Sequence, residues 1–489
     1  MFNKLKICLL VTLPLVLVNN LTAQTTTLDE AINSALQNNN KIKQYKEKLT
    51  QKEFQNLEAW GNFLPAVDFQ ASYNHLNDPM QIDLSPIKDV IVTLQSKNQV
   101  EFANIYNTVQ GLGQLSAQQR SALYSQYSAQ LDGLIPDFVE TFKKQDYKTA
   151  TIVGVQPLFL GGRLYAAKKF ASDELDASII ELQKIKDEVI QETVNNYLNV
   201  VLMKNVVDVR KDVLTGIIKH RDDAKRIYEE GLIANHNLLR AEVAVAEAER
   251  NLSDDENKLD LALIALRLSI GMNENDPIAI SDTLIYNRFT DSLNVMLEKA
   301  LRDQPVLRLI SKKKDAASDK YIAERANFLP TLAAFGKYEM YPEYLSSLEP
   351  RWVVGLQLKL NIFNGFKDYA KLQNAVHLEL EVNYIEADAK HKITLWVNKS
   401  FKDVNNSRIK YSKLEKTKEL AEENLRLNNK RFQSGMGTSL EVIDAQLSYE
   451  KVKIEMLQSL YDYYKSLTDL FVASGNAGEI LNVWNKEIN

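Results

Sequence analysis

The tetrapeptide Asn62-Phe63-Leu64-Pro65 recurs unchanged as Asn327-Phe328-Leu329-Pro330, and the repetition extends well beyond these four residues. Other identical pairs share the same spacing of 265 residues: Leu28 and Leu293, Ala35 and Ala300, Leu36 and Leu301, and Tyr73 and Tyr338. A second set is spaced by 204 residues: Tyr165 and Tyr369, Gly231 and Gly435, Ala241 and Ala445, and Gly271 and Gly475. An internal repeat decides the architecture. We therefore divide the chain into a first copy at 24–290, a second copy at 291–475 and a C-terminal tail at 476–489, the first copy being longer by a net 61 residues.

The first 23 residues have the features of a secretory signal peptide. Lys4 and Lys6 give a positive start, an apolar run of about a dozen residues follows at 7–18, and Ala23 ends a small-residue cleavage site. That run is too short to span a bilayer. The only cysteine, Cys8, lies inside this segment and away from a lipidation position. We therefore expect no lipid anchor, no disulfide and no thiol catalysis in the mature chain.

Glycine and proline usage predicts very long helices. The 17 glycines are about half the usual share. No proline falls between Pro157 and Pro277 or after Pro350. Since turns need these residues, we expect long helices at 163–230 and 366–434, each about 100 Å long. Two adjacent apolar stripes in the first helix let it pack on neighbours at both sides. The residues of these stripes are Ile190, Val194, Tyr197 and Val201, and Leu198, Leu202, Val206, Val209 and Val213.

Four segments alternate apolar and polar residues with a period of two, which predicts β-strands at 66–74, 147–157, 331–341 and 352–362. Their length of about ten residues suits a transmembrane strand, although half-buried strands of a soluble protein have the same period. Aromatic residues near the strand ends suggest an interfacial girdle, formed by Tyr73, Tyr338, Tyr341 and Trp352.

The two strand pairs differ in their connection. Residues 77–146 separate the first pair, whereas 342–350 separate the second, and this insert explains most of the difference in length between the copies. The insert is rich in Gln, Ser and Asn, with scattered apolar residues. Both short helices and disorder fit that composition.

The ordered set of motifs resembles the outer-membrane efflux protein family, the TolC family. The match covers nearly the whole mature chain except 77–146. Leu28-Asp29-Glu30-Ala31 is similar to the family's opening helix, and Asn-Phe-Leu-Pro to its entry from helix to strand. The segments Tyr228-x-x-Gly231-Leu232 and Phe432-x-x-Gly435-Met436-Gly437-Thr438 resemble the two turns at the tip of its helical tunnel.

The resemblance implies an α+β membrane protein that acts as a homotrimer. Three chains would give four strands each to a twelve-stranded outer-membrane barrel, and their helices would continue as a periplasmic tunnel. The implied function is an exit duct of a tripartite efflux or type I secretion system in a Gram-negative bacterium. Its partners would be a periplasmic adaptor and an inner-membrane transporter of the RND, ABC or MFS type. The residues that the resemblance places at the adaptor-binding tip are Gly231, Leu232, Ile233, Gly435, Met436, Gly437 and Thr438.

Oligomerisation has support from the residues as well. Four strands cannot close a barrel around a lumen, and an open sheet edge is not tolerated in lipid. The chain must therefore associate with copies of itself if its strands span the membrane, while the number three comes from the family.

Glu441 and Asp444 are the strongest candidates for a channel constriction. Their spacing of three places both carboxylates on one helix face. If that face lines a three-fold axis, six carboxylates converge and select cations. The alternative is an ordinary acidic helix start that the helix dipole stabilises. The chain departs from better-known family members at Gly437, where they often carry a basic residue, and at Asn237, where an acid is expected in the first turn.

The sequence shows no residue pattern typical of catalysis, metal binding or phosphate binding. His75, His220, His236, His377 and His391 have no metal-ligand spacing, and the glycine pair Gly161-Gly162 fits a helix cap better than a phosphate loop. We therefore expect no enzyme activity, no metal and no cofactor. Removing the two signal lysines takes the formal charge from −5 to about −7, which gives no basis for binding nucleic acid. The alternative function is a secreted coiled-coil scaffold or adhesin without a pore, which would have no use for amphipathic strands.

Overall fold

The computed structural model describes residues 25–346 and 348–485, so the expected signal peptide at 1–23 lies outside the described residues. The chain forms two compact units. The first, which we call the helical unit, comprises Met1–Leu57, Lys168–Tyr321 and Gln373–Asn489. The second, the strand unit, comprises Glu58–Ala167 and Ile322–Leu372.

The two copies of the repeat contain matching elements in the same order. The long helices α5 and α9 each have 67 residues, and the helices that follow them, α6 and α10, each have 35. The first copy consists of α1 (Leu28–Asn38), α2 (Asn40–Gly61), β1 (Ala66–His75), β4 (Asp146–Leu160), α5 (Arg163–Glu229) and α6 (Asn235–Ser269). The second consists of α7 (Leu293–Asp303), α8 (Pro305–Arg325), β5 (Thr331–Glu339), β6 (Trp352–Lys359), α9 (Lys367–Gln433) and α10 (Ser439–Ala473). The predicted duplication and the two long helices are confirmed.

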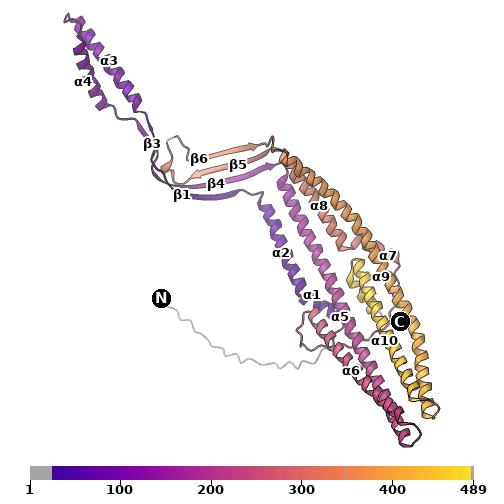
Figure 1. Cartoon of the computed structure of the whole chain (residues 1–489). Helices are drawn as coiled ribbons and strands as arrows, with labels where there is room; N and C mark the ends of the chain where they lie inside the picture. Colours follow the sequence, from indigo (N-terminus) through magenta and orange to yellow (C-terminus); the bar gives the residue numbers. More distant parts are fainter. Residues whose placement is uncertain (1–24, 347, 486–489) are drawn as a thin grey trace, which may run out of the picture. The chain divides into compact units, whose positions relative to one another are not determined.

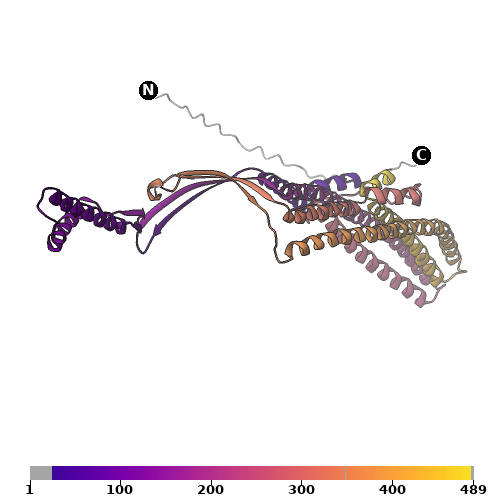
Figure 2. The same ribbon diagram turned by 90° about the horizontal axis from the view of Figure 1, so that it is seen from above.

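Within the helical unit the long helices run alongside one another, as Figures 1 and 2 show. Both apolar stripes predicted in α5 are buried, from Ile190 and Val194 through to Val213. Their side chains pack with residues of α1, α6, α9 and α10 in the main hydrophobic core. The two stripes therefore hold neighbours on both sides of α5, as the spacing predicted.

The last residues that the structure describes are part of this core. Residues 477–479 form a 3₁₀-helix, η3 (Ala477–Glu479), and α11 (Ile480–Trp484) follows it. Ala477 and Ile480 are fully buried, and the indole of Trp484 lies edge-on to the ring of Tyr464. The part of the predicted C-terminal tail that the structure describes is thus packed against the helices.

The strand unit contains an antiparallel sheet in the order β1-β4-β5-β6, visible in Figure 1. The four strands were predicted, with ends that differ by a few residues. The third ends at Glu339 because the chain then turns into the 3₁₀-helix η2 (Pro342–Tyr344). The fourth ends at Lys359, since its partner β5 begins at Thr331, which pairs with that residue.

The insert is ordered and helical. The hydrogen bond from Leu76 N–H to Gln145 O continues the β1–β4 ladder, and beyond it the short strands β2 (Met80–Asp83) and β3 (Val139–Lys143) pair with each other as a separate two-stranded sheet. Between them lie α3 (Ser85–Val109) and α4 (Ala117–Leu134), which pack as a hairpin. Of the two possibilities open for 77–146, the helical one is therefore correct, and the β2–β3 pair was not predicted.

Candidate functional site

Two equivalent turns join each long helix to the helix that follows it. Gly231 ends the α5 side with a φ of 76°, and Gly435 ends the α9 side with a φ of 69°. The next residue in each turn donates its backbone N–H to a carbonyl five residues earlier, at 3.0 Å for Leu232 and 2.9 Å for Met436. Glycine adopts this left-handed conformation without steric cost, so both helices stop abruptly. The two predicted tip turns are present and alike.

Each turn presents an apolar side chain to solvent at the same repeat position. Leu232 and Met436 are both 71% exposed. Ile233, in contrast, packs against a small buried cluster that includes Ala241 of α6 and Phe432 of α9. The tip therefore combines an internal apolar anchor with two exposed apolar residues available to a partner.

Glu441 has a structural role that the sequence analysis did not assign. Its carboxylate accepts a hydrogen bond from Thr438 N–H at 2.8 Å, and the Thr438 hydroxyl accepts one from Glu441 N–H at 3.3 Å. This reciprocal pair caps the start of α10. The hydrogen bond from Thr438 lowers the pKa of Glu441 below its ordinary value, and the Arg431 guanidinium adds to the effect. Glu441 is thus ionised at neutral pH in the single chain.

Arg431 brings a basic group to the turn that contains Gly437. Its guanidinium lies 3.6 Å from the Glu441 carboxylate and donates to the carbonyl oxygen of Met436 at 3.4 Å. Asp444, one turn further along α10, is exposed. The two acidic candidates therefore differ in their surroundings: Glu441 is held by its own helix start, whereas Asp444 faces solvent.

A buried contact at the tip joins the two copies of the repeat. The Nε2 of His220 on α5 lies 2.8 Å from the Oγ of Ser439, the first residue of α10. The imidazole also packs edge-on to Phe432, with ring centroids 4.6 Å apart. Burial lowers the pKa of His220. The sequence did contain a signal, because His220 continues the apolar stripe of Val213 and Ile217 at helical spacing.

A second link across the tip is exposed. Gln433 Nε2, at the end of α9, donates to the Asp223 carboxylate of α5 at 3.4 Å. Asp223 also pairs with Arg226 at 2.8 Å. His236 lies in the first turn of α6.

The four-stranded sheet has one continuous apolar face. The strand register places Phe69 opposite Ile152, Ile152 opposite Tyr338, and Tyr338 opposite Trp352, and directly opposed residues share a face. Many of these side chains are open to solvent in the single chain, with Val354 at 70% and Leu358 at 69%. Members of this face, which we call the apolar sheet face, are Val67, Phe69, Tyr73, Ile152, Ala334, Tyr338, Trp352, Val354, Leu356 and Leu358.

The opposite face carries most of the sheet's polar side chains, beside apolar residues such as Val155 and Phe335, and some of the polar groups bond to one another. The hydroxyls of Ser72 and Thr149 lie 2.8 Å apart. The buried carboxylate of Glu339 accepts hydrogen bonds from the Ala150 N–H at 2.9 Å, the Thr151 hydroxyl at 2.5 Å and the Tyr344 hydroxyl at 2.7 Å. A sheet with an apolar and a polar side separates two different environments.

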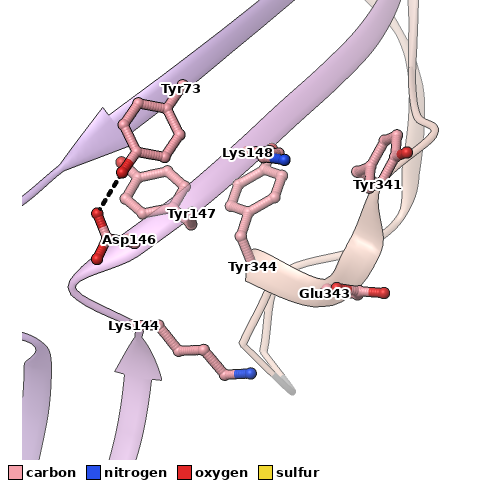
Figure 3. Close-up of a pocket in the computed structure, with 8 residues that line it drawn as sticks. All are labelled: Tyr73, Lys144, Asp146, Tyr147, Lys148, Tyr341, Glu343 and Tyr344. Carbon is pink, nitrogen blue, oxygen red and sulfur yellow. Dashed lines mark hydrogen bonds between the residues drawn. The ribbon is translucent and has the colours of Figure 1, made fainter.

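Aromatic and charged side chains gather at the sheet end that carries the insert. Figure 3 shows a pocket of about 310 Å³ there, in which Tyr73 donates to Asp146 at 2.6 Å. Tyr147 and Tyr344 stack at 5.5 Å between ring centroids. The pocket is lined by Tyr73, Lys144, Asp146, Tyr147, Lys148, Tyr341, Glu343 and Tyr344. Two of the four residues predicted for an aromatic girdle, Tyr73 and Tyr341, belong to it.

Among the residues that the structure describes, no group of three or more His, Cys, Asp or Glu side chains is placed to hold a metal ion. None of the described helices combines the length and apolar character needed to cross a membrane.

Comparison with known proteins gives matches over most of the chain. Residues 121–272 and 296–476 match the family described as "Outer membrane efflux protein". The alkaline protease secretion protein AprF of Pseudomonas aeruginosa is 24% identical over 253 residues, which are 49% of this chain and 51% of AprF. The chain thus matches about half the length of that curated relative.

Solved structures match at lower identity and higher coverage. The outer membrane protein VceC of Vibrio cholerae is 17% identical with a TM-score of 0.68, covering 92% of this chain and 96% of VceC. The MtrE outer membrane channel of Neisseria gonorrhoeae, in its open state, is 16% identical with a TM-score of 0.68, covering 92% and 89%. These likenesses concern the fold. Because the family match extends over more than half of the sequence, in both copies of the repeat, the chain belongs to the outer membrane efflux protein family.

Proposed function

We propose that the chain is an outer-membrane exit duct that works as a homotrimer. The observation that carries this proposal is the apolar sheet face, which is exposed and spans all four strands. Side chains such as Val354 and Leu356 need a non-aqueous partner, and lipid supplies one along the whole face. The polar face of the same sheet would then line a water-filled lumen.

The sheet edges support association of several chains. Within the described residues, β1 and β6 each pair with a strand on one side only. An open edge in lipid leaves backbone groups without partners, so β1 of one chain would pair with β6 of the next. With three chains, four strands each close a twelve-stranded barrel.

The tip turns would dock the rest of the export machinery. Leu232 and Met436 present equivalent exposed apolar side chains, which suit contact with a periplasmic adaptor. An inner-membrane transporter of the RND, ABC or MFS class would deliver cargo through that adaptor. The relative AprF is an alkaline protease secretion protein. The proposal therefore includes type I secretion as well as efflux.

Several further features belong to the same proposal. The protein would reside in the outer membrane of a Gram-negative bacterium, exported by residues 1–23 without a lipid anchor, with its helices in the periplasm. The insert 77–146 would lie outside the cell, because it joins the strands at the end opposite the helices. Glu441 and Asp444 would line the narrowest point of the tunnel.

A matched pair of variants tests the proposal. Leu356→Asp places a charge on the apolar sheet face, whereas Gln357→Asp places the same charge on the neighbouring position of the polar face. We expect Leu356→Asp to reduce detergent-extracted trimer severalfold, because a charge facing lipid is strongly unfavourable, and Gln357→Asp to leave it unchanged. Native mass spectrometry and planar-bilayer conductance provide the readouts. A detergent-independent, non-conducting wild-type chain that tolerates both changes would instead support the scaffold or adhesin alternative.

A further inference from the structure

Helix α3 of the insert carries an apolar stripe that the described residues of the single chain leave exposed. Six apolar residues at helical spacing form it, with exposed fractions from 37% to 78%. They are Ile87, Ile91, Leu94, Phe102, Ile105 and Val109, and Asn98 occupies the position between Leu94 and Phe102. We call this set the α3 stripe. Its steps of four, three, four, four, three and four residues are those of a helix that packs along another helix.

The hairpin cannot cover this stripe itself. The face of α3 that packs on α4 is the opposite one, with Val92, Ser96 and Val100 buried. No residue of α4 is buried in the chain as described. Two helices in contact along one face thus leave an apolar face of α3 in solvent over about six turns, and an exposed apolar surface of this extent marks an interaction site.

We propose that the α3 stripes of three copies pack against one another as a three-helix bundle over the outer mouth of the duct. This inference rests on the proposed trimer. The helical hairpin α3–α4 lies between β2 and β3 in the chain, and these two strands connect directly to β1 and β4. Of these, β1 is an edge strand of the four-stranded sheet. A trimer closed through its sheet edges therefore carries three identical hairpins at one end of the barrel, and the bundle would continue the same interface between copies.

The dimensions allow the three stripes to meet. Strands about 4.8 Å apart and tilted by about 40° give a twelve-stranded barrel a radius of about 12 Å. Helix axes in a three-helix bundle lie about 5–6 Å from its centre, given interaxial distances of about 8–10 Å. Because α3 has 25 residues and is therefore about 37 Å long, an inward lean of about 10° brings the far end of each helix, which carries Phe102, Ile105 and Val109, from the rim to bundle distance from the axis.

The composition of the stripe favours copies of itself over another partner. The stripe contains no charged residue, and the neighbouring Glu101 is paired with Arg120 of its own hairpin at 3.3 Å. Asn98 lies in the middle of the stripe, where an amide can bond to the same amide of the other copies. One such polar residue in an apolar seam fixes the register and number of helices.

Cysteine cross-linking in the full-length trimer tests the proposal. The described residues contain no cysteine, so Ile105→Cys introduces a single thiol into the stripe, and Ser125→Cys on the exposed side of α4 is the matched control. After oxidation in detergent, Ile105→Cys should give at least fivefold more covalent dimer on non-reducing gels than Ser125→Cys. Equal, low yields in a protein that native mass spectrometry shows to be trimeric would overturn the bundle and leave the proposed duct standing. Absence of a trimer would overturn both.

A charge variant adds a functional readout. Leu94→Glu/Ile105→Glu should separate the stripes by charge repulsion, raise single-channel conductance at least twofold and leave the trimer intact, because the sheet edges hold it. Ser121→Glu/Ser125→Glu adds the same two charges to the exposed side of α4 and should conduct like the wild type. Unchanged conductance in the stripe variant would contradict a bundle over the mouth.

Discussion

The imidazole of His220 and the hydroxyl of Ser439 lie 2.8 Å apart and join the two copies of the repeat at the tip of the helical unit. Both residues are buried, at 5% and 0% exposure. The contact connects α5 to the first residue of α10, directly beside the cap that holds Glu441. A movement of α10 relative to α5 at this end therefore has to break this contact or move both residues together.

The packing at His220 should weaken as the pH falls. Burial lowers the pKa of His220 below its ordinary value of 6.5 in the folded chain. Below pH 6.5 the unfolded state binds the proton first, so the free energy of unfolding is retained above pH 6.5 and falls as the pH drops through the folded pKa. The hydrogen-exchange protection factors of residues 431–445, corrected for the intrinsic exchange rate at each pH, should fall between pH 7 and pH 5. His220→Gln should remove much of this change, and His236→Gln, at an exposed position, should not.

The paired glycines at the ends of α6 and α10 should be sensitive to alanine. Gly271 and Gly475 have φ angles of 78° and 92°, and an added Cβ would lie 2.7 Å from the Asn38 Cβ and 2.8 Å from the Asp303 carbonyl carbon. We expect each Ala variant to lower the melting temperature by several degrees. Gly231→Ala has the same φ strain in open space and should cost about 1–2 kcal/mol. Equal effects at all three sites would show that close packing is unimportant.

Arg210 should be the most sensitive charged residue of the helical unit. Its Nε donates to Asp255 of α6 at 2.7 Å, and its guanidinium also pairs with Glu450 of α10. Both acids are nearly fully buried, at 4% and 5% exposure. Arg210→Met leaves Glu450 unpaired, and breaking a buried pair costs about 3–5 kcal/mol. Lys392→Met removes an exposed pair and should change the melting temperature little. A small effect of Arg210→Met on thermal unfolding would contradict this ranking.

The tip should be the surface that meets the adaptor. A cysteine or photo-crosslinker at Leu232 or Met436 should capture a periplasmic adaptor in cells, because both side chains are 71% exposed at the turn. The same probe at Leu112, in the turn of the insert, serves as the control. Capture of the adaptor from the insert and not from the tip would reverse the proposed orientation.

The sequence predicted the features that repeat or alternate. The pair Gly271 and Gly475 marked equivalent helix ends, and both residues have positive φ and face equivalent residues, Asn38 and Asp303, at the end of the short helix that opens their own copy. Alternation likewise located the four strands, since a period of two needs no tertiary information. The Thr438-x-x-Glu441 cap was also present as a local signature, although the sequence analysis considered only the charge of Glu441.

Other features depend on contacts between distant segments. His220 and Ser439 are 219 residues apart, and no local pattern connects them. The helical hairpin of the insert was obscured by its Gln and Asn content, because Asn98 and Asn104 occupy positions where a helix of simple amphipathic pattern has apolar residues. In both cases the arrangement depends on how the segments pack together, and no local sequence pattern contains that information.

The charges at the proposed constriction should control ion selectivity, and the cap at Glu441 dictates how to test this. Glu441→Ala would remove both the charge and the hydrogen bond to Thr438, so an effect on conductance would have two causes. Glu441→Gln keeps a capping side chain and removes the charge, and Asp444→Asn does the same for its exposed neighbour. If three copies of each carboxylate converge, like charges repel by about 1–2 kcal/mol per close pair, which opposes the lowering of the Glu441 pKa by its cap. Glu441→Gln/Asp444→Asn should therefore weaken cation selectivity and block by multivalent cations in planar-bilayer recordings, with the trimer unchanged. Unaltered selectivity and block would leave Glu441 as a helix cap paired with Arg431, and Asp444 as a solvated residue of the same helix.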